Sequence, residues 1–445
     1  MIARPRLALA SLTLLALAAP SLAGDAPPEV PATRTELKAV LEASKHNPPR
    51  LPSPPLSEAD REAMARADWS GADWSIYNNG RMRKYYLPAE LADLSGLRGD
   101  DPAMTLGGRF QTMLFWIVSR ANNCTYCMGH QESKLAAAGL VDDQIAELDG
   151  DWSSFPETDR AAFALARKLT HEPHRITDAD IDTARRFYTD VQVLEIINAV
   201  GNFNAMNRWT GALRIPQEEH RVYLTPTAPR YSSLRSLVAP LASDGSGSAP
   251  ACAAPSLRPP LESPTEVEAA LSACRSRTPR LPLVAEDRAR ALLPPDWPAG
   301  ALPQWVRLLA TFPKAGATRI ALHRAAEEKG TLDRRLRAEV AYIAARQDRA
   351  WYALGHARRR LESLGLSAAA IAALDGPGDA LGPAERPALS LARKLTVDPA
   401  LVTDADVAAL RAHYPDREVA ELIHQVSEAA YFDRVTEAGG LRLEP

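Results

Sequence analysis

The chain has no strong excess of either charge, no basic stripe with interleaved aromatic residues, and only four cysteines in 445 residues. Its net charge of −3 gives no field that would hold a phosphate backbone, so we expect no nucleic acid partner. Hydrophobic residues make up 46% and charged residues 24%, which is typical of soluble globular proteins and excludes a protein with many membrane spans. A chain of this length is expected to form roughly two to three domains.

The N-terminus combines a basic start, a short apolar run and small residues before Gly24. This pattern is typical of a secretory signal peptide covering residues 1–23. The apolar run at 7–19 is shorter than the roughly 20 residues that a spanning helix needs, and an uncleaved anchor is the alternative. No cysteine follows the cleavage site to carry a lipid. We therefore expect an exported protein, periplasmic or extracellular, that has no membrane contact after cleavage.

Composition divides the rest of the chain into four segments. Residues 24–56 are rich in proline and alanine without periodicity, and we expect an extended arm or a wrapping segment there rather than a core element. Residues 57–236 show helical periodicity, residues 237–275 have the composition of a linker, and a second helical region spans 276–445. The whole pattern predicts an all-α protein.

The apolar run at 113–118 is consistent with either a buried helix or a strand. It leads to Asn122 and Asn123, a pair that breaks a helix and can cap the next one. We therefore expect two helices that meet at these asparagines.

An internal repeat relates the two helical regions. Residues 129–210 match residues 355–436 at a constant offset of 226 without a gap, with 32 identical residues in 82 positions, or 39%. The hexapeptide LARKLT, for example, occurs at 165–170 and again at 391–396. Two unrelated helical stretches would share far fewer residues, so we interpret the second region as a second copy of the first domain.

The chemistry of the chain is concentrated at Cys124, Cys127 and His130. With Asn122 or Asn123 as the N-cap, Cys124 falls in the first turn of a helix, where unpaired N–H groups and the helix dipole favour a thiolate. The spacing of three places all three side chains on one side of that helix. A Cys-x-x-Cys pair there can close a disulfide with little backbone movement, and the imidazole can carry the proton.

The second copy separates functional from structural residues. The two cysteines correspond to Ala350 and Ala353, whereas His130 is kept as His356. A disulfide or metal site that folding required would have been kept, so we interpret the cysteine pair as functional. His130 has a structural interpretation as well as a catalytic one.

Other interpretations of the cysteines are a zinc site and a purely structural local disulfide. No fourth ligand with matching spacing is visible, and we expect neither a metal nor a cofactor. Cys252 and Cys274 flank the linker and are expected to form a structural disulfide that contributes roughly 3 kcal/mol.

Four asparagines occur only in the first copy, in a helical stretch near Gly201, and residues of other types replace them in the second copy. Hydrogen bonds between packed helices are the favoured interpretation, and a polar lining that faces the thiols is the alternative. The four residues are Asn198, Asn202, Asn204 and Asn207.

The sequence SRANNCTYCMGH at 119–130, followed by KLAAAGL at 134–140 and closed by FNAMNR at 203–208, resembles the carboxymuconolactone decarboxylase and alkylhydroperoxidase D-like superfamily. The similarity covers most of both repeats. It implies two tandem alkylhydroperoxidase D-like helical bundle domains, the second without the cysteines. It also implies a homo-oligomer of such pseudo-dimeric chains.

The resemblance implies a thiol-dependent peroxidase, a peroxiredoxin-like oxidoreductase, that acts on a hydroperoxide with a dithiol or thioredoxin-like reductant as partner. Cys127 would be the peroxidatic thiolate, Cys124 the resolving thiol, and His130 part of a proton relay. Position in the helix alone favours Cys124 as the nucleophile. The family pattern has a glutamate twelve residues before the first cysteine, where this chain has Thr112, and Glu132 is poorly placed to replace it.

Two other functions stay open. One is a non-catalytic helical assembly or binding module, in which the repeat itself is the purpose of the chain. The other is a lyase of the lactone decarboxylase type, whose chemistry does not need a Cys-x-x-Cys pair.

Overall fold

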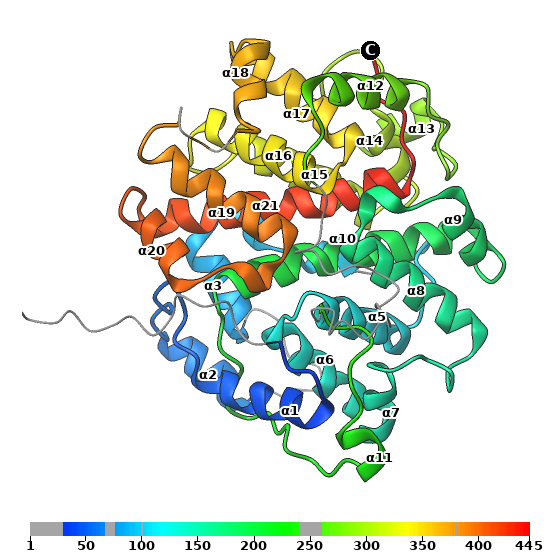
Figure 1. Cartoon of the computed structure of the whole chain (residues 1–445), viewed down its shortest axis with the longest axis vertical. Helices are drawn as coiled ribbons and strands as arrows, with labels where there is room; N and C mark the ends of the chain where they lie inside the picture. The colour runs from blue at the N-terminus through cyan, green and yellow to red at the C-terminus, as the bar shows by residue number, and fades with distance from the viewer. Residues whose placement is uncertain (1–29, 67–75, 99–100, 241–259, 377, 379–380) are drawn as a thin grey trace, which may run out of the picture.

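The computed structural model describes residues 30–66, 76–98, 101–240, 260–376, 378 and 381–445. Over these ranges the protein is all-helical and contains no β-strand, which confirms the expected all-α class (Figure 1). A single antiparallel bridge joins Thr33 to Arg235. No helix in the described ranges is both long enough and apolar enough to cross a membrane. The predicted signal peptide lies outside the described residues.

Two sets of helices make up the chain. The first set is α1 (Arg34–Ala43), α2 (Glu58–Arg66), α3 (Asn78–Tyr86), α4 (Ala89–Ala92), α5 (Gly108–Ala121), α6 (Thr125–Ala137), α7 (Asp142–Glu147), α8 (Glu157–His171), α9 (Asp178–Arg185), α10 (Asp190–Ala212) and α11 (Pro229–Ser232). The second set is α12 (Pro264–Arg275), α13 (Glu286–Arg290), α14 (Gln304–Leu309), α15 (Ala315–Glu328), α16 (Arg334–Asp348), α17 (Trp351–Ser363), α18 (Ala368–Ala373), α19 (Glu385–Val397), α20 (Asp404–Arg411) and α21 (Asp416–Ala438).

The helices recur at the offset of the sequence repeat. α6, α7, α9 and α10 each begin and end 226 residues before α17, α18, α20 and α21. The predicted helix pair around the asparagines is present as α5 and α6. Its counterpart in the second half is α16 and α17, so the order of these helices is the same in both halves, and α5 and α16 differ in length by one residue.

The segment 24–56 contains a helix where an extended arm was expected, so that expectation was wrong for α1. Thr33 accepts a hydrogen bond from the backbone of Glu36, whose carboxylate accepts from the backbone of Thr33. Leu37 and Leu41 project from the same face and are fully buried. The short helix was obscured by the prolines on both sides of it.

The expected linker at 237–275 likewise contains α12, which is a helix and not linker. Ser263 and Glu266 form the same reciprocal cap, and Pro264 occupies the first turn, where its missing N–H is not needed. Residues 241–259 of the expected linker lie outside the described residues.

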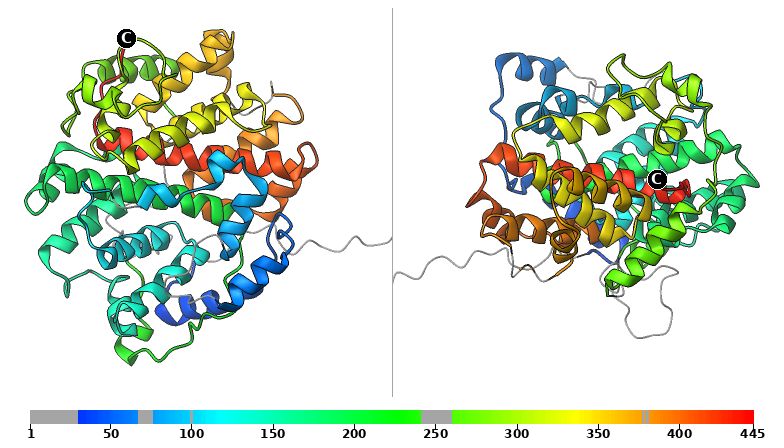
Figure 2. Two further views of the ribbon diagram at one scale, coloured as in Figure 1. Left: turned by 180° about the vertical axis from the view of Figure 1, so that it is seen from behind. Right: turned by 90° about the horizontal axis from the view of Figure 1, so that it is seen from above.

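The centre of the molecule is the pair formed by α10 and α21, each 23 residues long. They lie side by side across the middle of the molecule, with most of the first half on one side and most of the second on the other (Figures 1 and 2). Gly201 of α10 permits this close approach, because a Cβ atom there would come within 2.9 Å of the Tyr431 ring. Both helices are buried along most of their length.

Contacts between the halves are reciprocal. Arg208 of α10 donates to the backbone carbonyl of Thr396 at 2.7 Å, and Arg434 of α21 donates to that of Thr170 at 2.8 Å. Each arginine and each threonine is related to its counterpart by the offset of 226. Reciprocity of this kind is what a twofold axis between two like units produces.

A second reciprocal pair extends this relation to the N-terminal part of each half. Arg50 donates to Asp404 at 2.8 Å, and Arg280 donates to Asp178 at 2.7 Å. Both arginines also donate to the carbonyls at the end of the long helix of their own half. The segments that precede α2 and α13 therefore occupy equivalent positions.

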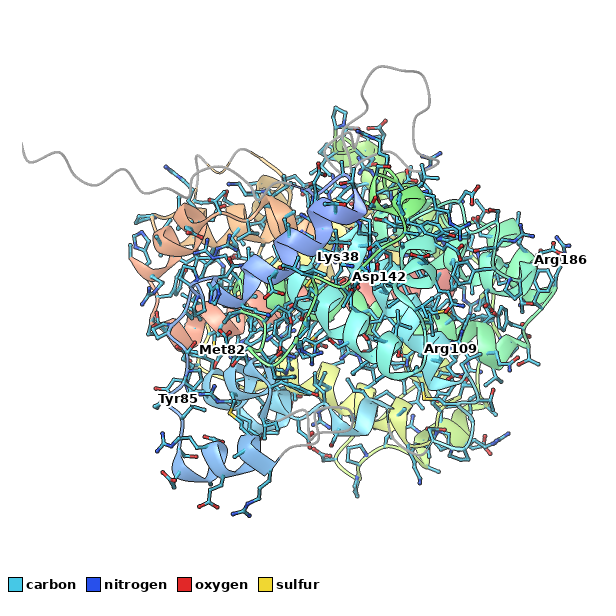
Figure 3. All side chains as sticks on the ribbon, turned by 90° about the horizontal axis from the view of Figure 1, so that it is seen from below. Lys38, Met82, Tyr85, Arg109, Asp142 and Arg186 are labelled. Atoms are coloured by element: carbon cyan, nitrogen blue, oxygen red, sulfur yellow. The ribbon has the colours of Figure 1, made fainter. Side chains whose placement is uncertain are left out.

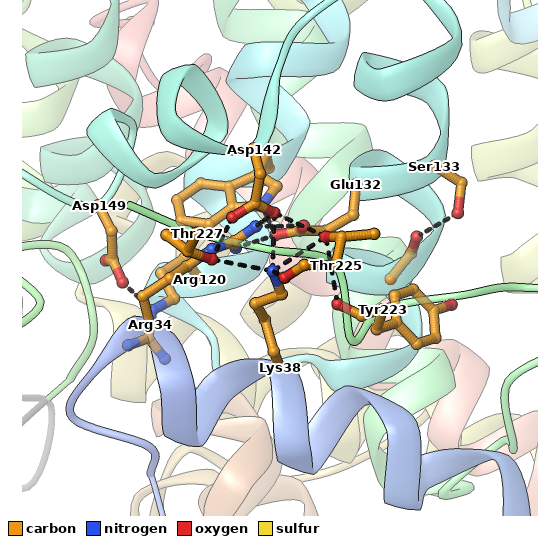
Figure 4. A network of polar contacts seen from close by, with 12 residues as sticks. Arg34, Lys38, Arg120, Glu132, Ser133, Asp142, Asp149, Tyr223, Thr225 and Thr227 are labelled. Carbon is orange, nitrogen blue, oxygen red and sulfur yellow. Dashed lines mark hydrogen bonds and ion pairs between the residues drawn. The ribbon is translucent and has the colours of Figure 1, made fainter. Parts of the chain in front are cut away.

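A network of buried charges anchors α1 to the first half. Arg34 pairs with Glu132 and Asp142, and Lys38 lies 3.0 Å from Asp142 (Figure 4). Seen from below, Lys38 and Asp142 lie next to each other near the middle of that face (Figure 3). Trp116 also donates to Glu132, at 2.9 Å. Glu132 therefore holds helices together and is not available to the cysteines.

Candidate functional site

The cysteine segment begins in a tight turn between α5 and α6. Asn122 ends α5, and Asn123 adopts a left-handed backbone conformation with φ of 49° that asparagine tolerates better than most residues. The N-cap of α6 is Cys124, so the expected N-cap at either asparagine was wrong. The Asn122 amide instead donates to Asn204 and Asn207 of α10, which removes it from capping.

Cys124 and Cys127 are buried free thiols that share one neighbour. Each sulfur lies 3.1 Å from the hydroxyl of Thr210 on α10. That hydroxyl has a single hydrogen, which it can donate either to a thiolate or to the carbonyl of Met206 at 2.9 Å. Thr210 can therefore stabilise a thiolate and can accept a hydrogen bond from a thiol.

The two thiols differ in pKa. Burial raises the pKa of Cys124, but hydrogen bonds from Cys127, Thr210 and the backbone outweigh it, and the pKa is lowered overall. Burial, followed by the hydrogen bond and the charge of Cys124, raises the pKa of Cys127 well above its ordinary value. Of the two, Cys124 therefore loses its proton more readily, and its position at the N-terminus of α6 acts in the same direction.

His130 lies one turn beyond Cys127 and is held from both sides. Its Nε2 is 2.7 Å from a carboxylate oxygen of Glu218, and its Nδ1 is 3.0 Å from the guanidinium of Arg221. Burial lowers the pKa of His130 to about 4, although Glu218 opposes the shift. The imidazole is thus neutral at pH 7. Its Nδ1 accepts from Arg221, whereas Nε2 lies close to Glu218 but makes no hydrogen bond of good geometry with any described residue.

Glu218 is the site residue that sequence reasoning missed. Burial raises its pKa, but His130 and Arg221 outweigh burial and hold the pKa at about 2. It also accepts hydrogen bonds from the hydroxyl of Tyr126 at 2.8 Å and from the backbone of Asn78 at 3.0 Å. The internal repeat could have identified Glu218 from the sequence, because Glu444 lies at the corresponding position of the second copy, 226 residues later.

The same network occurs in the second half, which lacks the Cys-x-x-Cys pair. His356 lies 3.0 Å from Glu444, and the hydroxyl of Tyr352 donates to the same carboxylate at 2.7 Å. The backbone of Gln304, at the start of α14, also donates to it. The Tyr–His–Glu network therefore has a structural role in both halves, since it fastens the segment after the long helix to the start of α3 or α14.

Two cavities adjoin the thiol pair. Cys127 and His130 line a cavity of about 250 Å³ that also has walls from α3, α5, α10 and the second half. Cys124 and Thr210 line another of about 330 Å³. Of the two sulfurs, Cys127 faces the first space and Cys124 the second.

The equivalent space in the second half is nearly closed. A cavity of about 40 Å³ lies beside Ala353 and His356. His323 stacks on Phe432 there with ring centroids 4.3 Å apart, and both line this space. The second half therefore lacks both the thiols and the room beside them.

The four asparagines serve two purposes. Asn204 and Asn207 are fully buried and accept hydrogen bonds from Asn122, and Asn198 accepts one from the Tyr431 hydroxyl at 2.6 Å. The expected helix-packing role is confirmed for these three, and Asn207 also lowers the pKa of both thiols by a hydrogen bond, as the alternative interpretation expects. Asn202 lines the cavity beside Cys127, which fits the alternative interpretation of a polar lining that faces the thiols.

The other predictions from the sequence concern a metal site, the cysteines Cys252 and Cys274, and Thr112. Among the described residues, no cluster of three or more histidine, cysteine or acidic side chains could hold a metal ion. Cys274 is a free, buried thiol 3.6 Å from the carbonyl of Leu441. Its predicted partner, Cys252, lies outside the described residues. Thr112 bonds to the carbonyl of Gly108 within α5.

No family model matches the sequence, and no curated protein matches it either. A buried thiol pair in which hydrogen bonds lower the pKa of one member, next to two cavities, is suited to reversible two-electron oxidation.

Proposed function

We propose that the protein is a thiol-dependent oxidoreductase that reduces hydroperoxides through Cys124 and Cys127. The observation that supports this best is the contact of both sulfurs with Thr210, which holds them close together with a stabilised thiolate at Cys124. Cys127, in turn, faces a cavity that can admit a substrate. Neither cysteine is needed for the fold, because alanines replace both in the second half.

The first step is a proton transfer within the pair. The Cys124 thiolate takes the proton of Cys127, and Thr210 redirects its hydroxyl hydrogen to the sulfur that becomes charged. This gives Cys127, which faces the cavity, the negative charge that attack on a peroxide requires. Cys124 is the base in this step, and His130, which is neutral at pH 7 and held between Glu218 and Arg221, is not required as one. His130 and Glu218 shape the wall of the cavity.

The following steps balance in atoms and electrons. The Cys127 thiolate attacks the outer peroxide oxygen, the O–O bond breaks, and the alkoxide leaves and takes a proton from water. The sulfenic acid on Cys127 then condenses with the Cys124 thiol, which forms the disulfide and releases water. A dithiol reductant returns two electrons and restores the thiols. The second cavity gives that reductant a separate approach to Cys124.

The recurrent helices and the reciprocal contacts support a matching proposal for the fold. The two halves are tandem alkylhydroperoxidase D-like bundles, and the second takes the place of a partner subunit. If the signal peptide is used, the enzyme works outside the cytoplasm, where a thioredoxin-like partner has to supply the electrons.

The test is consumption of cumene hydroperoxide by the full chain with dithiothreitol as the reductant. Cys124→Ser and Cys127→Ser are each expected to reduce turnover to the uncatalysed rate, because either change prevents the disulfide. Cys274→Ser is the matched control, since it removes a buried thiol far along the chain from the pair. Unchanged turnover in both of the first two variants would rule out the proposal.

A further inference from the structure

The cavity beside Cys127 has an apolar wall and a cationic end. Leu94, Leu97, Phe115 and Met206 form the apolar wall. The cationic end includes Arg83 of α3, whose guanidinium is almost completely buried at 3% exposure. A buried cation is costly unless an anion or several hydrogen bonds compensate it.

Arg83 is compensated only in part. It donates to the backbone carbonyls of Leu91 and Ala92, and it lies 3.3 Å from Nε2 of His424. Within the part of the chain that the structure describes, no carboxylate pairs with it. Burial lowers the pKa of Arg83 to about 10, so the guanidinium is still charged at neutral pH.

The other charges around the cavity leave a positive balance. Glu428 is the single acidic side chain among the described residues that line it, and Arg319 pairs with this glutamate at 2.7 Å. Burial lowers the pKa of His424 to about 3, so this histidine is neutral at pH 7, as His130 is. Lys134, at the exposed edge, adds a further positive charge.

We propose that this cavity binds a small organic molecule with a carboxylate at one end, held by Arg83, and an apolar body against Phe115 and Met206. The carboxylate site is argued from the cavity alone. That the bound molecule also carries a hydroperoxide facing Cys127 rests on the proposed function. Nε and Nη2 of Arg83 bond to the backbone and to His424, so a carboxylate would accept a charge-assisted hydrogen bond from Nη1. The space of about 250 Å³ is below the roughly 300–1,000 Å³ typical of drug-sized ligands. The substrate class is therefore a short hydroperoxy acid.

Binding can be measured without turnover. Calorimetric titration of the reduced full chain with hexanoate and with hexanamide compares two probes of the same shape and different charge. We expect hexanoate to bind at least about tenfold more tightly. Equal affinity for the two probes would overturn the inference.

Variants connect the preference to one residue. Arg83→Gln is expected to abolish the preference for hexanoate, and Arg83→Lys to retain most of it. Arg337→Gln is the matched control, because Arg337 is another buried arginine that donates to backbone carbonyls, those of Leu332 and Lys329, and does not line this cavity. If Arg83→Gln does not fold, the comparison of the two probes on the native chain still decides the question.

Turnover separates this inference from the proposed function. Both stand if 6-hydroperoxyhexanoate is consumed faster than cumene hydroperoxide and Arg83→Gln removes the difference. Arg83-dependent binding of hexanoate without consumption of any peroxide would support the anion site and contradict the peroxidase. Consumption of both peroxides at equal rates, with no preference for hexanoate, would support the peroxidase and contradict the anion site.

Discussion

Thr210 connects the two cysteines more directly than any other side chain. Its hydroxyl touches both sulfurs, and Thr436 occupies the same place in the second half, where it bonds to the carbonyl of Phe432 and has no thiol beside it. The same threonine position therefore bonds only within its own helix in the second half, as Thr436, and contacts both thiols in the first half, as Thr210. Both thiols are equally buried and Thr210 lowers the pKa of each, so the pKa difference between them comes from their mutual hydrogen bond, which lowers the pKa of Cys124 and raises that of Cys127.

Thr210→Val is expected to raise the pKa of Cys124, because the thiolate loses a hydrogen bond that holds its pKa down. Alkylation of Cys124 by iodoacetamide at pH 7, followed by mass spectrometry, should slow by roughly three- to tenfold. Thr436→Val removes a hydroxyl of equal burial and should leave the rate unchanged. An equal effect of both variants would mean that Thr210 acts only through the fold.

Glu218 makes the first half sensitive to acid. Burial alone would raise its pKa, but His130 and Arg221 lower it from 4.5 to about 2. Its contribution to stability is complete above pH 4.5 and is lost as the pH falls through about 2. Glu218→Gln should therefore lower the free energy of unfolding at pH 7 by roughly 3 kcal/mol and flatten its decline between these pH values.

Urea unfolding followed by circular dichroism from pH 2 to pH 7 measures this decline. The neighbouring Glu219 is exposed and provides the control, since Glu219→Gln should leave the curve as it is in the native chain. A Glu218→Gln curve with the native slope would contradict the assignment of the carboxylate to His130 and Arg221.

At the scale of elements, the crossing of α10 and α21 depends on one glycine. Gly201→Ala gains roughly 1 kcal/mol of helix propensity, but the new Cβ would lie 2.9 Å from the Tyr431 ring and 3.0 Å from Val435. Because Tyr431 is fixed by its bond to Asn198, we expect a net loss of roughly 1–2 kcal/mol in unfolding free energy. Gly211→Ala, in the same helix with its nearest contact at 3.4 Å, should be neutral or stabilising.

Much of this element structure could be predicted from the sequence, and the misses have physical causes. The asparagine pair that follows the apolar run predicted two helices there, which are α5 and α6, and the second copy pointed to Cys124 and Cys127. The cap of α6 was missed because the Asn122 amide bonds across to α10, a tertiary contact that no local rule contains. Glu218 was missed because it reaches His130 only after the chain has passed through α10 and returned.

At the scale of the molecule, the two halves have the same helices and different interiors. The first keeps a cavity of about 250 Å³ beside Cys127, and in the second His323 and Phe432 nearly close the equivalent space. The second half also supplies Arg319, His424 and Glu428 to the cavity of the first. It thus completes the candidate site as well as covering α10.

The first half alone is expected not to be a stable monomer. Residues 24–240 would expose the face of α10 that α21 covers, so we expect a self-associated dimer or aggregate in analytical ultracentrifugation. Coexpression with residues 260–445 should give a one-to-one complex, because the reciprocal arginine contacts re-form. A monodisperse, helical monomer of the first half would contradict the view that the second half replaces a partner subunit.

The central claim is that Cys124 and Cys127 act as one redox pair. The most direct measurement is mass spectrometry of the reduced full chain before and after one equivalent of hydroperoxide, with peptide mapping of all thiols. We predict the loss of two hydrogens as a Cys124–Cys127 disulfide, while Cys274 stays reduced. Thiols that are unchanged, or oxidation that spares this pair and falls on Cys274, would contradict the account.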